Sequence, residues 1–215
     1  MQTVTRRRAV WGLLVVTIVW GATFIWMKQA MNALQSEIDF YGQTAVVSVL
    51  VGGRFLIAAI ALFIGSSKAR AALREKELWS GGTVLGLILL VGFTTQMVGI
   101  DTISPSTSAF LTSLYVVFTA MISTKMTGQP VTRMMIAGVL LATFGAGFIE
   151  GPPHLSWGKG EILTVICAFF FALHIIFTQS ITQRMDPLGV TITSFLIVSI
   201  GSLAISFLMG GEDTF

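Results

Sequence analysis

The sequence has few charged residues and almost no cysteine or histidine. Only 11% of its 215 residues are Asp, Glu, Lys or Arg, whereas charged residues make up about 25% of a typical soluble domain. The single cysteine, Cys167, excludes an intrachain disulfide and a CxxC metal site. The chain also lacks HExxH, Walker A and GxSxG motifs and paired carboxylates within its apolar runs. We therefore predict no catalytic residues, no bound metal and no other cofactor.

Long apolar runs make up much of the sequence. Hydrophobic residues make up 54% of the chain, and the mean hydropathy is +0.85. Most runs approach the ~20 residues that a helix needs to cross the hydrocarbon core. The sequence predicts an all-α, polytopic helical membrane protein with about seven transmembrane helices. The runs cover residues 9–31, 44–64, 81–100, 104–124, 134–149, 161–181 and 188–209.

The basic residues predict the orientation of these helices. If the N-terminus is cytoplasmic, ten of the 13 lysines and arginines fall on the inner side, as the positive-inside rule requires. They are Arg6, Arg7, Arg8, Lys68, Arg70, Arg74, Lys76, Lys125, Arg133 and Arg184. This placement accounts for the net charge of +3 without a nucleic-acid partner. We predict an integral protein of the cell (inner) membrane with a cytoplasmic N-terminus.

The first run also has the alternative interpretation of a cleaved signal peptide, because three arginines precede an apolar stretch. No small-x-small cleavage site stands at the right place, and Trp20 and Trp26 interrupt the run. We therefore predict an uncleaved first helix.

The order of the runs predicts two units of opposite orientation. Residues 1–150 contain five runs, and a loop with Pro152 and Pro153 separates them from two more runs in residues 151–215. WGATFIWMKQAM in the first run resembles FALHIIFTQSIT in the sixth, which would start from the other side of the membrane. This pattern favours a five-plus-five inverted repeat whose second repeat is incomplete.

Two local signals concern helix ends and helix contacts. Ser104 followed by Pro105 is a helix-start signal, a capping hydroxyl before a proline at the first helical position. Gly81, Gly82 and Gly86 leave a face on which another helix can approach closely. Hydroxyl side chains along the run 104–124 make it a candidate wall of a substrate site.

Several of these segments resemble one transporter family. WGATF, RFLIAAIAL, GIDTISPSTSAFLTSLYVVFTAMIS and GVLLATFGAG in the first unit, with GKGEILTVICAFFFALHIIF and DPLGVTITSFL in the second, are similar to EamA-type members of the drug/metabolite transporter superfamily. Members commonly have a glutamate in the hairpin where this chain has Gly128-Gln129-Pro130. They also have ten helices, so the chain resembles a truncated member or a fragment, or one that a second copy completes.

The resemblance implies a secondary transporter, an exporter of small metabolites or drugs, that works by alternating access around a central cavity. Its partners would be a small-molecule substrate, the lipid bilayer, a coupling proton or other ion, and a second copy in a homodimer. The alternative is a non-transporting membrane scaffold or an incomplete remnant of such a transporter.

Polar and aromatic residues inside the runs are the candidate substrate-binding residues, because polar groups are costly in hydrocarbon. We predict that Arg54 contacts an anion or serves as a counter-charge for Glu37 or Asp39. The alternative is that its side chain extends to the membrane surface or binds carbonyls of neighbouring helices. His174 either exchanges protons for coupling or is a neutral structural histidine. The full set is Trp20, Thr23, Arg54, Gln96, Ser113, Tyr115 and His174.

Overall fold

The described part of the chain is helical throughout. The computed structural model describes residues 2–127, 132–147 and 158–210, and every regular element in these ranges is an α-helix. The bounds are α1 Gln2–Ala33, α2 Gln35–Tyr41, α3 Gln43–Gly65, α4 Ser67–Ala72, α5 Lys76–Ile100, α6 Pro105–Ser113, α7 Tyr115–Thr127, α8 Arg133–Gly147, α9 Lys159–Thr182 and α10 Pro187–Gly210. The prediction of a polytopic helical membrane protein is confirmed.

Six segments of the described residues are long and apolar enough to cross a membrane. They are Val10–Ala33, Gln43–Gly65, Lys76–Ile100, Pro105–Thr124, Lys159–Thr182 and Pro187–Gly210, which match six of the seven predicted runs. The remaining run, 134–149, corresponds to α8, whose 15 helical residues are fewer than a span requires and whose last predicted residues lie outside the described ranges.

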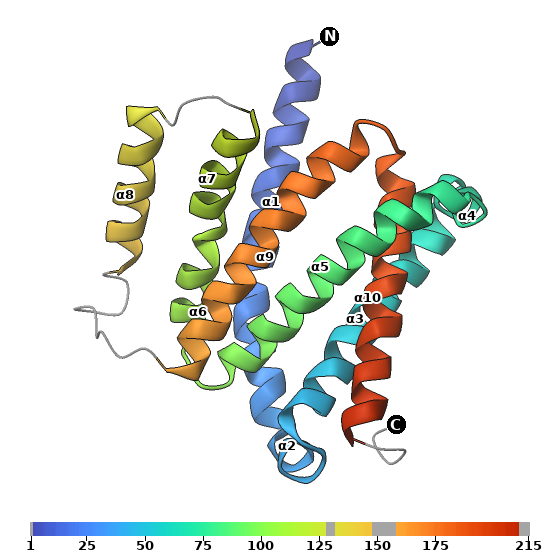
Figure 1. The fold of residues 1–215 in the computed structure, drawn as a ribbon, viewed down its shortest axis with the longest axis vertical. Coiled ribbons are helices and arrows are strands. Elements are labelled where there is room, and N and C mark those ends of the chain that lie inside the picture. The colour runs from blue at the N-terminus through green and yellow to red at the C-terminus, as the bar shows by residue number, and fades with distance from the viewer. Residues whose placement is uncertain (1, 128–131, 148–157, 211–215) are drawn as a thin grey trace.

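The helices form a bundle in which segments distant in sequence lie together (Figure 1). Helix α10 lies against α3 and α5, and α9 lies against α5, α6 and α7. Helix α8 stands at the edge of the molecule beside α7. The N-terminus of α1, helix α4 and the link from α9 to α10 lie at one end of the bundle, and α2 lies at the other (Figure 1). We refer to these as the α4 end and the α2 end.

Close helix contacts occur at glycines. A Cβ atom at Gly82 would lie 2.5 Å from Thr193 Cβ of α10, and one at Gly86 would lie 2.7 Å from Ile197 Cβ. Near the other end of α5, a Cβ at Gly99 would lie 2.9 Å from the Gly160 carbonyl oxygen of α9. The predicted glycine face of α5 is therefore confirmed as a packing face. In lipid, such close approach supplies the dispersion contacts that hold helices together.

The run 104–124 forms two helices where one was predicted. Its start is as expected: Ser104 accepts the backbone N–H of Thr107 at 3.0 Å, and Pro105 follows in the first turn. The helix is interrupted at Leu114, whose N–H donates to Leu111 O at 3.2 Å, three residues back. The Ser113 hydroxyl donates to Phe110 O at 2.6 Å, and such back-bonding bends helices because it competes for a backbone acceptor.

Candidate functional site

A cavity of about 270 Å³ lies between α1, α3 and α5. Most of its lining side chains are apolar, and Arg54 and Thr23 are the polar ones. We call it the Arg54 cavity, and its lining residues are Thr23, Trp26, Met27, Ala30, Leu50, Val51, Arg54 and Met97. A few polar groups in a mainly apolar cavity are typical of small-molecule sites.

Helix α1 supplies half of the cavity wall. Thr23, Trp26, Met27 and Ala30 stand at positions i, i+3, i+4 and i+7, so they share one face of the helix. The Thr23 hydroxyl donates to Trp20 O at 2.6 Å, and its oxygen lone pairs therefore remain as acceptors. This wall offers a ligand apolar surface and one acceptor.

Arg54 is the central residue of α3, which runs from Gln43 to Gly65. Its Cζ atom lies 4.4 Å from the centroid of the Phe93 ring of α5 and 5.5 Å from that of Phe55. These distances are within the range of a cation–π interaction. A guanidinium nitrogen also lies 3.8 Å from the Met27 sulfur, a weak acceptor. The rings of α3 and α5 therefore hold the guanidinium in the cavity wall.

No carboxylate in the described part of the chain forms an ion pair with Arg54. The predicted alternatives Glu37 and Asp39 have other partners: Glu37 accepts the Ser36 hydroxyl at 2.7 Å, and Asp39 accepts the Gln35 amide at 3.2 Å. Arg54 likewise donates to no backbone carbonyl of the described residues. Among the described residues, Arg54 therefore neither pairs with either acid nor bonds to a backbone carbonyl. Arg54 is exposed, so contact with an anion and extension towards the membrane surface both stay as interpretations.

The ring beside Arg54 belongs to a series of edge-to-face aromatic contacts across five helices. Phe195 of α10 contacts Phe55, Phe55 contacts Phe93, and Phe93 contacts Phe171 of α9, with ring centroids 5.0–5.2 Å apart. Trp20 of α1 meets Phe171 at 6.5 Å. Each such pair is worth roughly 0.5–1.5 kcal/mol beyond the area that it buries. The series fixes the position of Phe93, and Phe93 in turn supports Arg54.

Polar contacts join the same three helices at the α2 end. Lys28 of α1 donates to Ile100 O at 3.0 Å and also to the Asp101 carbonyl oxygen, at the end of α5. Gln43 of α3 donates to Asp101 Oδ2 at 2.9 Å and to Val98 O at 3.2 Å. The last carbonyls of a helix lack intrahelical partners, and a lysine there also interacts favourably with the helix dipole. The Arg54 cavity therefore lies next to a polar junction of the helices that form it.

The structure brings two of the seven candidate residues, Thr23 and Arg54, to the cavity and separates the others from it. Gln96 is fully buried and donates to Thr112 Oγ1 of α6 at 3.2 Å, while its Oε1 has no partner in the described chain. Trp20 is 44% exposed and does not line the cavity, although it lies one turn from Thr23.

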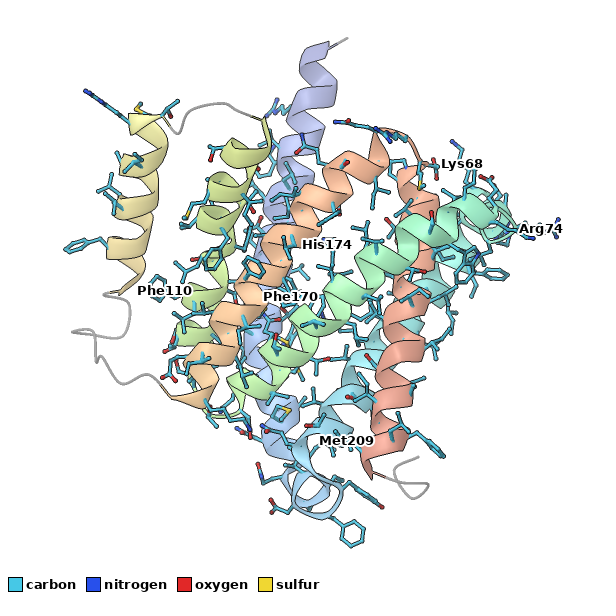
Figure 2. The ribbon with its side chains drawn as sticks, in the orientation of Figure 1. Lys68, Arg74, Phe110, Phe170, His174 and Met209 are labelled. Carbon is cyan, nitrogen blue, oxygen red and sulfur yellow. The ribbon has the colours of Figure 1, made fainter. Side chains whose placement is uncertain are left out.

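The last three candidates belong to the later helices. Ser113 is exposed, and its hydroxyl bonds to the backbone of its own helix. Tyr115 packs against the hydrophobic core. His174 is half-buried midway along α9 (Figure 2) and forms no hydrogen bond or ion pair with a described residue. None of the three lines the Arg54 cavity.

Sequence reasoning missed most of the apolar wall. Met27, Ala30, Leu50, Val51 and Met97 were not singled out, and Trp26 was not among the candidate binding residues. The spacing of four residues from Thr23 to Met27 was an available signal for α1. No comparable signal existed for Met97, since it is one apolar residue among many on α5.

Three comparisons relate the chain to known proteins. Residues 7–150 match the EamA-like transporter family. A protein of Archaeoglobus fulgidus described as an uncharacterized transporter is 29% identical over 178 residues, which are 82% of this chain and 50% of that protein. The chain thus spans about half the length of this curated relative. No solved structure matches the chain.

Proposed function

The chain belongs to the EamA-like transporter family, and on that premise we propose that it is a secondary transporter that exports small metabolites or drugs by alternating access. The observation that carries the proposal is the Arg54 cavity, which places one charged group among apolar side chains between three spanning helices. A charged residue at the centre of a spanning helix is costly, and such residues typically mark substrate or ion pathways.

We propose that residues 1–150 and 151–215 belong to two units that rock against each other during transport. All eight residues that line the Arg54 cavity belong to the first of these units. Inverted repeats with a central substrate site are a common plan of secondary transporters. The sequence contains no Walker A motif, so we propose that an ion gradient, a proton gradient or exchange drives transport.

The proposed orientation places the α4 end in the cytoplasm. We expect a membrane-impermeant maleimide to label Ser36→Cys, at the α2 end, in intact cells, and to label Ser67→Cys, on α4, only after the membrane is opened. Both serines are exposed, and a Cys167→Ser background removes the native thiol, which is buried. Labelling of Ser67→Cys in intact cells, with Ser36→Cys protected, would reverse the orientation.

The experiment that tests transport is flux in proteoliposomes containing the purified 215-residue chain. A panel of radiolabelled anionic, zwitterionic, neutral and cationic metabolites is loaded inside, and initial rates are measured with and without a proton or sodium gradient. We expect saturable flux above that of empty liposomes for at least one class, with a rate that responds to a gradient or to unlabelled substrate on the opposite side.

A monodisperse, helical chain that moves no compound would favour the alternative, a non-transporting remnant. Circular dichroism and size-exclusion chromatography of the same preparation distinguish this outcome from misfolding.

A further inference from the structure

We propose that the Arg54 cavity binds a small organic anion, in which one carboxylate or sulfonate group is attached to an apolar body. The inference rests on the proposed transport function and adds the chemical class of the substrate. Three features carry it: the charge of Arg54, which has no countercharge among the described residues, the aromatic contacts of its guanidinium, and the composition of the remaining wall.

The first feature is a positive charge that has no countercharge in the described part of the chain. Arg54 lies about 16 Å from either end of α3, at 1.5 Å per residue, so its charge is far from both helix ends. Its described contacts are two aromatic rings and a thioether, none of which carries a negative charge. A ligand that brings an anion to this point neutralises the charge, whereas a cationic ligand adds repulsion.

The second feature is the way in which the rings hold the guanidinium. A guanidinium is planar and carries five N–H donors in a fixed fork that matches a carboxylate or sulfonate in a bidentate contact. Phe93, at 4.4 Å, takes up one side of Arg54, and Met27 engages one of its nitrogens weakly. Because the contact with the Phe93 ring limits the rotation of the Arg54 side chain, less conformational freedom is lost when an anion binds.

The third feature is the rest of the wall, which selects an apolar body. Trp26, Met27, Leu50 and Met97 present aromatic, thioether and aliphatic surface. Methionine side chains adapt to irregular ligand shapes. The volume of about 270 Å³ corresponds to roughly nine water molecules at about 30 Å³ each, which suits a single-ring compound.

The test is calorimetric titration of the chain in lipid nanodiscs with probes of matched shape and different charge. Benzenesulfonate and benzenesulfonamide differ by one charge at nearly constant volume, benzylammonium reverses the sign, and methanesulfonate removes the ring. We expect benzenesulfonate to bind at least about tenfold more tightly than each of the other three, given the strength of charge-assisted contacts and apolar burial.

Variants of Arg54 test whether this residue causes the preference for the anionic probe. Arg54→Gln should remove the preference for benzenesulfonate over benzenesulfonamide, and Arg54→Lys should retain part of it because the charge remains. Arg74→Gln is the matched control, since Arg74 lies exposed at the edge of the molecule beside α4 (Figure 2) and does not line the cavity. It should leave all four affinities unchanged.

Equal affinity for all probes, tighter binding of benzylammonium, or an anion preference that survives Arg54→Gln would overturn the inference, as would a lack of binding by every probe. The binding experiment and the flux experiment can contradict their hypotheses independently of each other. A chain that transports neutral or cationic compounds but shows no anion preference remains a transporter with another substrate class. A chain that binds benzenesulfonate through Arg54 but supports no flux would support the proposed anion site and contradict the proposed transport function.

Discussion

Replacement of Arg54 by glutamine is expected to lower benzenesulfonate flux to less than about one-tenth of the parent rate. Hydrogen bonds to charged groups contribute about 1.5–3 kcal/mol, and 1.4 kcal/mol corresponds to a factor of ten in binding. Arg54→Lys keeps the charge but loses the planar fork that stacks on Phe93, so an intermediate rate is expected. The measurement is the initial rate of counterflow in proteoliposomes, with Arg74→Gln as the control.

The melting temperature of Arg54→Gln distinguishes a transport role of Arg54 from a packing role, because only the packing role predicts a decrease. If Arg54 binds the substrate, its replacement removes a charge that is unfavourable within the membrane, and the melting temperature should stay constant or rise. If Arg54 mainly supports the packing of α3 on α5, the melting temperature should fall along with the flux. Parent-like flux in Arg54→Gln would contradict any role of this residue in transport.

Replacement of Gly82 by leucine is expected to abolish the native packing of α5 on α10. A Cβ atom at Gly82 would lie 2.5 Å from Thr193 Cβ and 3.1 Å from the backbone nitrogen of Ser194. Thr193 has little room to move, because it is fully buried and its hydroxyl contacts Leu78 O at 3.2 Å and Gly189 O at 3.0 Å. Overpacking of this kind costs about 1–3 kcal/mol or more, and leucine adds three further carbons to the clash.

The expected result for Gly82→Leu is a loss of the monodisperse peak in fluorescence-detected size-exclusion chromatography, or a large drop in melting temperature. Gly53→Leu is the control, since a Cβ atom at Gly53 of α3 meets no atom within 4 Å. Loss of a helical glycine should leave stability unchanged or raise it by about 0.5–1 kcal/mol. Equal stability of the two variants would contradict the close α5–α10 contact.

The positions of the six long apolar segments followed largely from the sequence, whereas the short helices α2 and α4 were not predicted. Most apolar runs are about as long as the hydrocarbon core is thick, so run length located the helices without knowledge of their neighbours. The start of α6 at Ser104-Pro105 was also predictable, because a helix cap depends on residues within one turn. The break at Leu114 was not predicted, since back-bonding by Ser113 is an optional conformation of a common residue.

The site was only partly predictable. Arg54 and Thr23 were identified because a charge or a hydroxyl inside an apolar run is conspicuous. Gln96 was chosen on the same principle, yet it donates to Thr112, whereas the adjacent Met97 lines the cavity. The sequence marks both residues as belonging to α5 but not which direction each side chain takes.

The sequence by itself thus determined the membrane class, the helices and the rarity of charge that makes Arg54 notable. Only the tertiary structure decided which helix faces meet, that Phe93 supports Arg54, and that residues of three helices line one cavity beside it. The physical reason is the solvent. In water, an apolar stripe on a helix predicts its buried face, but in a bilayer both the lipid and the protein interior are apolar, so that contrast largely disappears. Helix orientation is then set by close packing and a few polar contacts, which exist only in the assembled bundle.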